Sequence, residues 1–323
     1  MEPVRWGVLS TARINVDAVL APAATTEKAD VVAVASRDRT RAQTYARAHG
    51  IERAYGSYDE LLADPDVEAV YNSLPNSMHV DWTLRALEAG KHVLVEKPFG
   101  RRPDEIARAF DVADSAGLVL MEAFMYRHHP QMHTLRELVE NGAIGESRMI
   151  LASFHGQMAS DDIRMRPELD GGALMDLGCY CVSGARLLAG EPLVVFGQQV
   201  LAPSGVDLRF AGLLRFDNDV LAEVDCAFQM PFGTGLEAVG SEGSLHLSSP
   251  WVCDDPRIVL RRGDTAAPVE VEDDDRYRLQ LDNFSEAIRG EAEPLLGRLD
   301  ALGQARAIAA LYRSADSATP QAP

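Results

Sequence analysis

The first 122 residues alternate short apolar runs with amphipathic segments. Val4 to Leu9 and Val31 to Ala35 have the length and composition of buried strands, whereas residues 39–49 have a helical pattern. Further strands are expected at 67–74, 92–95 and 118–122, and further helices at 14–20, 80–89 and 103–115. Such alternation favours parallel strands with right-handed crossovers. We therefore predict a doubly wound parallel sheet over residues 1–123, with its ligand crevice at the carboxyl ends of the strands.

The pattern changes beyond residue 123, where short turns join most of the apolar runs. Strands are expected at 148–155, 194–201, 208–216, 220–228 and 235–247, and helices at 131–141, 172–188 and 300–314. The tail from 315 to 323 is expected to be loose. Residues 124–323 are therefore predicted to form an α+β domain, with a large, mostly antiparallel open sheet and helices on one face.

Length and charge narrow the class of protein. A chain of 323 residues is long enough for two domains. Its formal net charge of -18 opposes the phosphates of nucleic acid and anionic lipid, so neither nucleic acid nor membrane is an expected partner. No apolar stretch approaches the roughly 20 residues of a membrane span, and the four cysteines lack disulfide or zinc spacing. These features favour a cytoplasmic enzyme.

The turn after the first expected strand is a candidate phosphate site. It contains Ser10, Thr11, Ala12, Arg13 and Ile14. Free backbone N–H groups at such a strand-to-helix turn can bind a pyrophosphate. The three glycine positions of the dinucleotide-binding fingerprint are occupied here by Ser10, Ala12 and Asn15, of which the first two are small enough for close phosphate approach. A plain strand-to-helix turn is the alternative interpretation.

The end of the second expected strand indicates which dinucleotide is bound. An enzyme that uses NAD commonly has an acidic residue there, whereas this chain has Ser36, with Arg37 beside it and Arg41 a turn later. A serine hydroxyl and arginines can bind a 2′-phosphate, which predicts NADP. Two alternatives stay open: Asp38 could bind the ribose of NAD, or the arginines could belong to a solvated helix start.

A lysine follows the strand expected at 92–95. Lys97 lies in the run Glu96-Lys97-Pro98, where burial disfavours its charged form unless it has a partner or a catalytic role. Glu96 is a candidate for part of that partnership.

The chain resembles the glucose-fructose oxidoreductase, inositol dehydrogenase and rhizopine-catabolism family (Gfo/Idh/MocA). The segments that carry the resemblance are 7–14, 74–79 (Leu-Pro-Asn-Ser-Met-His), 96–98 (Glu-Lys-Pro) and 171–180. Within the family, segments 6–14 and 122–130 are most similar to the branch of dimeric dihydrodiol dehydrogenases and NADP-dependent D-xylose dehydrogenases. The resemblance implies a Rossmann domain at the N-terminus and a second domain for substrate binding and oligomerisation, with subunits paired through its sheet as a homodimer or homotetramer.

The same resemblance implies that Lys97 contacts the nicotinamide ribose and the reacting oxygen. Asp176 and Tyr180 lie four residues apart in an expected helix, which places both on one face. Tyr180 stands where other branches have histidine. A phenol can exchange a proton with substrate if a cation such as Lys97 lowers its pKa from about 10. We expect Tyr180 to be the acid/base, Lys97 its electrostatic partner, and Asp176 an acceptor for a substrate hydroxyl. A core tyrosine and a solvated carboxylate are the alternatives.

Several other polar residues are weaker candidates. Leu74, Pro75, Asn76 and His79 are expected near the cofactor, although His79 could instead cap the next helix. Substrate contacts are expected from Tyr126, Arg127 and Arg166, the last of which could equally be a surface residue. The cluster of His128, His129 and His133 lacks the carboxylates that would favour a metal site.

These observations predict an oxidoreductase that moves a hydride between NADP, with NAD as the alternative nucleotide, and a hydroxyl or carbonyl carbon of a sugar-like polyol. Two other interpretations remain. The enzyme could keep a bound nucleotide that is recycled, in sugar-sugar oxidoreduction or redox-assisted glycosidic cleavage. The chain could also be a non-catalytic NADP-binding regulator, although such a protein would not need Lys97, Asp176 and Tyr180 together.

Overall fold

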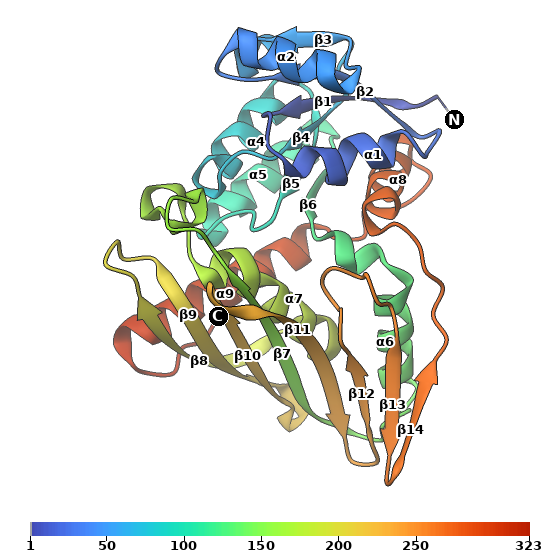
Figure 1. Ribbon diagram of the computed structural model, residues 1–323, viewed down its shortest axis with the longest axis vertical. Helices are drawn as coiled ribbons and strands as arrows, with labels where there is room; N and C mark the ends of the chain where they lie inside the picture. Colours follow the sequence, from blue (N-terminus) through green and yellow to red (C-terminus); the bar gives the residue numbers. More distant parts are fainter. Residues whose placement is uncertain (1) are drawn as a thin grey trace. The chain divides into compact units, whose positions relative to one another are not determined.

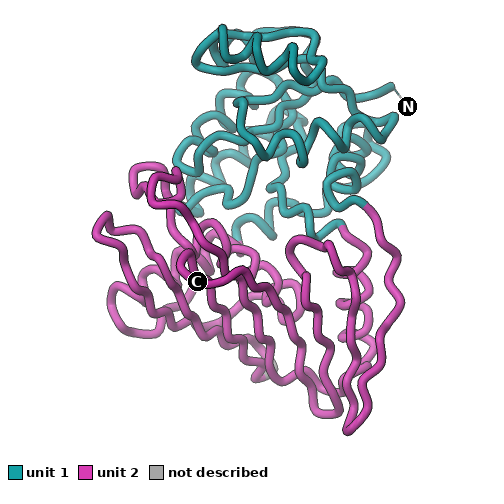
Figure 2. The backbone as a smooth tube through the Cα atoms, viewed as in Figure 1, with its two compact units in different colours: residues 1–128, 275–302 teal, residues 129–274, 303–323 magenta. Residues whose placement is uncertain are grey.

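The chain folds into two compact units in the computed structural model, which describes residues 2–323. Unit 1 comprises Met1–His128 and Asp275–Leu302, and unit 2 comprises His129–Asp274 and Gly303–Pro323 (Figure 2). The boundary at 123 and 124 expected from the sequence therefore differs from the observed division. Residues 124–128 and the returning segment 275–302 pack with the first unit, because each contributes buried side chains to it.

Unit 1 is built on a six-stranded parallel sheet with the strand order β3-β2-β1-β4-β5-β6. Its strands are β1 (Val4–Leu9), β2 (Ala29–Ala35), β3 (Arg53–Tyr55), β4 (Ala69–Asn72), β5 (His92–Glu96) and β6 (Leu120–Ala123). Its helices include α1 (Ala21–Ala23), α2 (Arg39–His49), α3 (Tyr58–Leu62), α4 (His79–Glu88), α5 (Pro103–Ala116) and α8 (Arg276–Arg289) (Figure 1). The strand order reverses between β1 and β4, which confirms the predicted doubly wound sheet.

Two parts of unit 1 depart from the expected elements. The helix expected at 14–20 is a π-helical turn, η1 (Val16–Leu20), continued by α1. The short edge strand β3 was not expected, since it has only three half-buried residues and therefore no clear apolar signal.

Helix α8 lies far along the sequence from the other elements of unit 1 but is bound to it by side chains. Thr26 donates a hydrogen bond to Asp282 at 2.6 Å. Arg289 pairs with Glu68 at 2.9 Å, and the Phe284 ring lies 5.3 Å from the buried ring of Trp6 in β1. Polar and apolar contacts together therefore fix this helix against the first unit.

Unit 2 is built on an eight-stranded sheet with the order β14-β13-β12-β11-β7-β10-β9-β8. Its strands are β7 (Ser147–Gln157), β8 (Pro192–Leu201), β9 (Asp207–Phe216), β10 (Leu221–Ala227), β11 (Gln229–Gly240), β12 (Ser244–Leu247), β13 (Ile258–Arg262) and β14 (Thr265–Val269). Only β7 and β10 pair in parallel, which confirms the predicted mostly antiparallel sheet. The segment expected as one strand at 235–247 is a hairpin of β11 and β12.

Helices cover one face of this sheet. They are α6 (Pro130–Glu140), α7 (Cys179–Ala189) and α9 (Arg298–Ser317), and α7 contacts β7, β10 and β11. Along β9, buried and exposed residues alternate strictly from Leu208 onward, so one face of the strand belongs to the core. The opposite face is open and carries exposed apolar side chains, among them Leu213, which is 53% exposed.

Helix α9 and the residues after it differ from the expected helix and loose tail. The helix runs to Ser317, and the backbone of Gln321 then pairs with Val195 of β8 in both directions, at 2.8 and 2.9 Å. Backbone pairing therefore holds this tail against the edge strand. Within residues 2–323, no helix is both long enough and apolar enough to cross a membrane.

A pair of glycines connects the sheet of unit 2 to the helix that carries two candidate catalytic residues. Gly172 has a φ of +133°, and a Cβ at this position would lie 2.1 Å from Oδ1 of Asp207. The buried Asp207 carboxylate accepts hydrogen bonds from the Leu174 backbone N–H at 2.7 Å and from the Tyr312 hydroxyl at 2.9 Å. Only glycine at 172 allows this carboxylate to approach the start of the helix.

We predict that Gly172→Ala destabilises the protein well beyond the cost of its backbone angle alone. Gly50→Ala is the matched control, because Gly50 has a φ of +71° and a Cβ added there would meet no atom within 4 Å. The control is expected to lower the free energy of unfolding by about 1 kcal/mol. Gly172→Ala should lower it by at least about 2 kcal/mol more, because Asp207 must move away from its buried hydrogen-bond partners. Denaturant unfolding measures both values. Equal losses for the two variants would contradict the argument.

Candidate cofactor and catalytic sites

The turn after β1 is fixed by a small network of buried side chains. Ser10 has a φ of +146°, a region that normally favours glycine, and it occupies the first glycine position of the dinucleotide-binding pattern. Its Oγ bonds to Ser73 Oγ at 2.8 Å and accepts the Ala12 N–H at 3.1 Å. Asn15 donates to the Ser10 carbonyl at 3.1 Å and accepts from Ser73 at 2.6 Å. The chain thus holds a glycine-like turn with hydrogen bonds in place of glycine.

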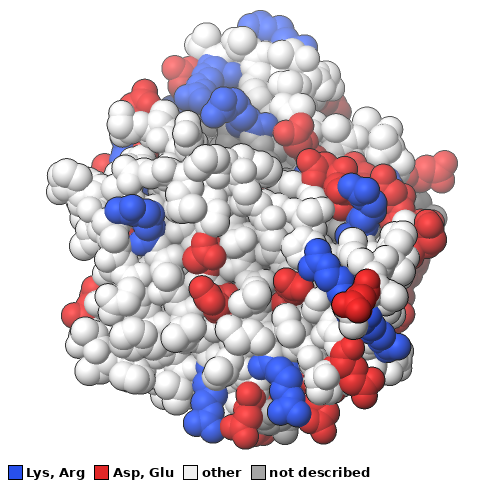
Figure 3. Space-filling view, turned by 60° about the horizontal axis from the view of Figure 1, so that its bottom comes forward, with Lys and Arg blue, Asp and Glu red and all other residues white. Residues whose placement is uncertain are grey.

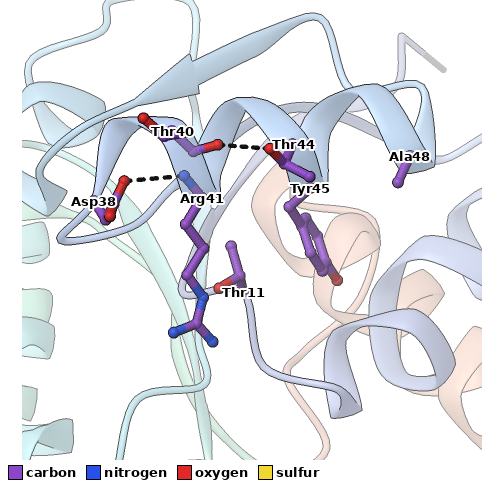
Figure 4. Close-up of a pocket in the computed structure, with 7 residues that line it drawn as sticks. All are labelled: Thr11, Asp38, Thr40, Arg41, Thr44, Tyr45 and Ala48. Atoms are coloured by element: carbon purple, nitrogen blue, oxygen red, sulfur yellow. Dashed lines mark hydrogen bonds between the residues drawn. The ribbon is translucent and has the colours of Figure 1, made fainter.

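A pocket lies beside this turn, along α2. Its lining residues are Thr11, Asp38, Thr40, Arg41, Thr44, Tyr45 and Ala48. Figure 4 shows Arg41 and Tyr45 extending from the same side of α2 toward Thr11. The pocket therefore combines an arginine, an aromatic ring and hydroxyl groups next to the candidate phosphate turn, a composition that fits the adenosine end of a dinucleotide.

The residues that follow β2 favour a phosphate over a ribose hydroxyl. Ser36 is buried, whereas Arg37 and Arg41 are exposed and make no ion pair among residues 2–323. Burial raises the pKa of Tyr58, and the nearby charges of Arg37 and Arg41 oppose that rise, so both cations lie close to its hydroxyl. Asp38, the alternative ribose ligand, is the N-cap of α2 and accepts the Arg41 N–H at 3.0 Å. Tyr58 carried no sequence signal for this site.

The loop that presents Lys97 is held by buried groups on both sides. Lys97 is half-buried at the end of β5, and its backbone N–H donates to Glu96 at 3.2 Å. The Phe99 N–H donates to the buried carboxylate of Glu122 at 2.8 Å. Tyr71 of β4 makes a short hydrogen bond to Glu96. The three residues 97–99 therefore lie on a backbone fixed by β4, β5 and β6 together.

His79 has a different position from either of its two predicted roles. Its side chain is buried, with Nδ1 2.8 Å from the Pro98 carbonyl and Nε2 2.7 Å from the Leu74 carbonyl. Burial lowers its pKa to about 4, against the opposing effect of the two carbonyls. The ring is uncharged near neutral pH and has one N–H, which can donate to either the Pro98 or the Leu74 carbonyl. His79 does not cap α4, whose N-cap has no side-chain hydrogen bond. It ties the loop after β4 to the Lys97 loop.

Tyr277 of α8 is a neighbour of Lys97 that sequence reasoning missed. Burial raises the pKa of Tyr277 to about 12; the Glu96 carboxylate adds to the rise, and Arg276 and Lys97 oppose it. The phenol therefore lies within electrostatic range of the candidate catalytic lysine. No signal in the sequence linked these positions, because 180 residues separate them and α8 was not predicted.

Tyr126 and Arg127, predicted to contact substrate, lie in unit 1. Tyr126 is fully buried, with its ring 6.1 Å from that of Phe124. Arg127 lies 3.4 Å from Asp300 in an ion pair whose arginine side chain is only 10% exposed. Tyr126 is therefore a core residue, and the Arg127 guanidinium is engaged with a carboxylate of the same unit.

Asp176 and Tyr180 belong to one continuous helical segment of unit 2. Asp176 lies in a π-helical turn, η6 (Leu174–Gly178), which continues into α7. Such turns occur frequently at functional sites. Arg164, also missed from the sequence, pairs with Asp176 at 2.9 Å.

The Tyr180 side chain is largely enclosed by aromatic residues. Its ring lies 5.5 Å from that of Phe154 on β7 and 6.2 Å from that of Trp251. Only 6% of Tyr180 is exposed, so the ring direction is set by packing.

The remaining candidates have simple placements. Arg166 is exposed and has no ion-pair partner among the described residues. His129 is the N-cap of α6 and accepts the Gln131 N–H at 3.1 Å. Within residues 2–323, no group of three or more His, Cys, Asp and Glu side chains is arranged to hold a metal ion.

The fold and the turn after β1 are those of a dinucleotide-binding domain, and comparison with known families identifies the class as an oxidoreductase. Residues 4–124 match the oxidoreductase family with an NAD-binding Rossmann fold, and residues 132–246 match the GFO/IDH/MocA C-terminal domain. The chain therefore belongs to the GFO/IDH/MocA family, which confirms the resemblance seen in its motifs.

Similar proteins act in sugar chemistry. The chain is 37% identical to the D-xylose 1-dehydrogenase (NADP(+)) 2 of Haloferax volcanii, over 97% of both proteins. A 3-ketoreductase from Actinomadura kijaniata, solved with NADP and TDP-benzene, has a TM-score of 0.91 and 32% identity, over 97% of this chain and 98% of that one. An aldose-aldose oxidoreductase from Caulobacter crescentus, solved with glycerol, has a TM-score of 0.92 and 27% identity, over 99% and 100%.

We predict that Arg41→Ala raises the KM for NADP by about 10- to 100-fold while changing the KM for NAD little, because only NADP has the 2′-phosphate that a charge-assisted hydrogen bond would hold. Arg39→Ala is the control, since Arg39 lies on the same helix, is 58% exposed and pairs with Glu60 at 2.7 Å. Steady-state kinetics with both nucleotides measures the effect. Equal losses with NAD and NADP would show that Arg41 does not recognise the phosphate.

Proposed function

We propose that this protein is an NADP-dependent oxidoreductase that transfers a hydride between the nicotinamide and a hydroxyl or carbonyl carbon of a sugar or sugar-like polyol. The observation that carries the proposal is Lys97, a half-buried cation at the carboxyl end of β5 whose backbone is held by buried groups. The D-xylose dehydrogenase and the 3-ketoreductase to which the chain is similar support the same chemistry.

The residues of unit 1 fit NADP in two places. The turn of Ser10 to Ile14 offers backbone N–H groups for the pyrophosphate, and its small side chains permit close approach. Ser36, Arg37 and Arg41 are suited to the 2′-phosphate. Leu74, Pro75 and Asn76 border the loop that His79 ties to Pro98, and we assign them to the nicotinamide ribose side. When bound, the nicotinamide ring accepts or donates the hydride.

Lys97 supplies positive charge to the reaction in this proposal. In the oxidation direction, the substrate hydroxyl loses its proton as its carbon loses a hydride, and negative charge develops on the oxygen. A fixed ammonium group stabilises that charge without reorganising during the step. The hydrogen bonds of Glu96 and Glu122 to the loop backbone keep the lysine in place.

Tyr180 and Asp176 have the remaining roles. Tyr180 takes the hydroxyl proton during oxidation and returns it to the carbonyl oxygen during reduction. Asp176 accepts a hydrogen bond from a neighbouring substrate hydroxyl and so orients the sugar. We also assign Arg166 to the substrate, because it is exposed close in sequence to the Gly171 turn that leads to Asp176.

A second candidate is an enzyme whose nucleotide stays bound and is recycled between two sugars. The structural similarity to an aldose-aldose oxidoreductase favours it. Purified protein that shows the near-ultraviolet absorbance of reduced nicotinamide, and loses it when an oxidising sugar is added without free NADP, would support this candidate. Strict dependence on added NADP would rule it out.

We further propose that the protein forms homodimers or homotetramers through the open face of the eight-stranded sheet, and that it works in the cytoplasm. Leu213 and Leu221, on neighbouring strands of that face, are 53% and 46% exposed. Figure 3 shows a broad area of the molecular surface where charged side chains are sparse. Exposed apolar side chains such as Leu213 and Leu221 commonly mark an interface when they form a patch.

We predict that Lys97→Met and Tyr180→Phe each lower kcat by more than about 100-fold, because each removes a group that stabilises charge or moves a proton in the transition state. NADP affinity, measured by fluorescence titration, should change by less than about threefold in Tyr180→Phe, which retains the aromatic packing. Normal turnover in both variants would refute the mechanism.

We predict that Leu213→Arg converts the assembly to a smaller species, because a charge buried in an apolar interface costs several kcal/mol. Light scattering after size-exclusion chromatography measures the mass. Leu299→Arg is the control, since Leu299 is 84% exposed but lies on α9 in unit 1. A monomeric wild-type protein would contradict the proposed association.

A further inference from the structure

The segment before the Gly171-Gly172 turn is fixed to the helix that carries Asp176. The Arg164 carbonyl accepts the Gly172 N–H at 3.0 Å, and a Cβ at Gly171 would lie only 2.2 Å from the same oxygen. The Arg164 side chain then reaches forward to Asp176, with Nε 2.9 Å from Oδ2. Backbone and side chain of one residue thus hold the turn and the carboxylate together.

The Arg164 guanidinium forms ion pairs with two carboxylates. Besides Asp176, its Nη1 lies 3.2 Å from Asp162, and Asp162 also accepts the Arg164 backbone N–H at 2.9 Å as the N-cap of a short 3-10 turn. The charge of Asp176 is the main cause that raises the pKa of Arg164, so the arginine stays protonated. The group formed by Asp162, Arg164 and Asp176 has a net charge of about -1 when all three are ionised.

The surrounding segment is acidic as well. Residues 158–176 contain five acidic side chains and two arginines, Arg164 and Arg166. With both arginines counted, the segment has a net charge of about -3 when all seven groups are ionised. A phosphate attached to a sugar whose hydroxyl binds Asp176 would lie within the Debye length of about 8 Å of the group formed by Asp162, Arg164 and Asp176 at physiological salt. Like charges at that separation oppose binding.

We propose that the substrate is a neutral sugar or polyol without a phosphate or nucleoside diphosphate group, and that Arg164 is the positioning residue that holds Asp176 for it. The inference rests on the proposed function, in which Asp176 binds a substrate hydroxyl. The inference favours the substrate class of one relative over that of another. D-xylose, named for the D-xylose 1-dehydrogenase, is a neutral sugar, whereas the 3-ketoreductase was solved with a TDP derivative.

The first experiment compares neutral aldoses, the corresponding sugar phosphates and thymidine diphosphate sugars at saturating NADP. We expect kcat/KM for the best neutral sugar to exceed that of its phosphate by at least about 100-fold. A preference for phosphorylated sugars, or equal use of both, would overturn this inference and leave the proposed function intact. Absence of NADP-linked turnover with every class would instead overturn the proposed function.

The second experiment tests Arg164 itself. Arg164→Leu should raise the KM for the neutral sugar by about tenfold or more, with a smaller change in kcat and an unchanged KM for NADP, because the loss is in substrate orientation. Arg164→Lys should restore part of the affinity and guards against misfolding of the leucine variant. Arg257→Leu is the matched control, since Arg257 binds Asp255 at 2.6 Å on an exposed loop of the same unit. An unchanged sugar KM in Arg164→Leu would refute the role.

The third experiment tests the charge argument. Asp162→Asn keeps an oxygen acceptor for the Arg164 N–H but removes one negative charge from the group. The ratio of kcat/KM for a sugar phosphate to that for its neutral sugar should rise about fivefold, the effect of roughly 1 kcal/mol of relieved repulsion. An unchanged ratio would overturn the argument that the negative charge of this group excludes phosphorylated sugars.

Discussion

The candidate catalytic machinery of unit 1 depends on how the backbone of residues 97–99 is held. This loop follows a buried strand, and its backbone groups cannot all reach water. The Phe99 N–H is met by Glu122 at the end of β6, and the Pro98 carbonyl by His79 at the start of α4. Because buried polar groups are costly when unpaired, these contacts leave the loop little freedom. The backbone position of Lys97 is therefore set by residues that have no chemical role in the proposed reaction.

The same principle governs unit 2. The start of the helix that carries Asp176 is met by the buried carboxylate of Asp207, which Tyr312 of α9 also binds. Free N–H groups at a helix start need acceptors, and here the acceptor comes from a strand more than 30 residues later. Each unit thus places a candidate functional side chain next to a turn whose backbone is paired with side chains from distant parts of the sequence.

This arrangement explains what could be predicted. Local patterns are sufficient for the parallel sheet and for α2 over residues 39–49. Lys97, Asp176 and Tyr180 are candidates through the motifs that resemble the family, and their roles stay predictions. Residues that act at long range give no local signal. Arg164 and Tyr277 resemble any polar or aromatic residue in sequence, and α8 returns to unit 1 after the whole of unit 2. The surroundings of Tyr126 and Arg127 could not be predicted either. They depend on burial and on an ion pair with Asp300, which lies far away in sequence.

The distribution of charge is the last constraint, and it acts differently in the two units. The chain is strongly acidic overall, yet Arg37 and Arg41 make no ion pair among the described residues, so their charge remains available to an anion. Arg164 has the opposite situation, since two carboxylates already surround it. A cation attracts an external phosphate only to the extent that neighbouring acids have not neutralised it. Arg37 and Arg41 are therefore suited to a phosphate, whereas the arginine beside Asp176 fits the proposed hydroxyl-rich neutral substrate.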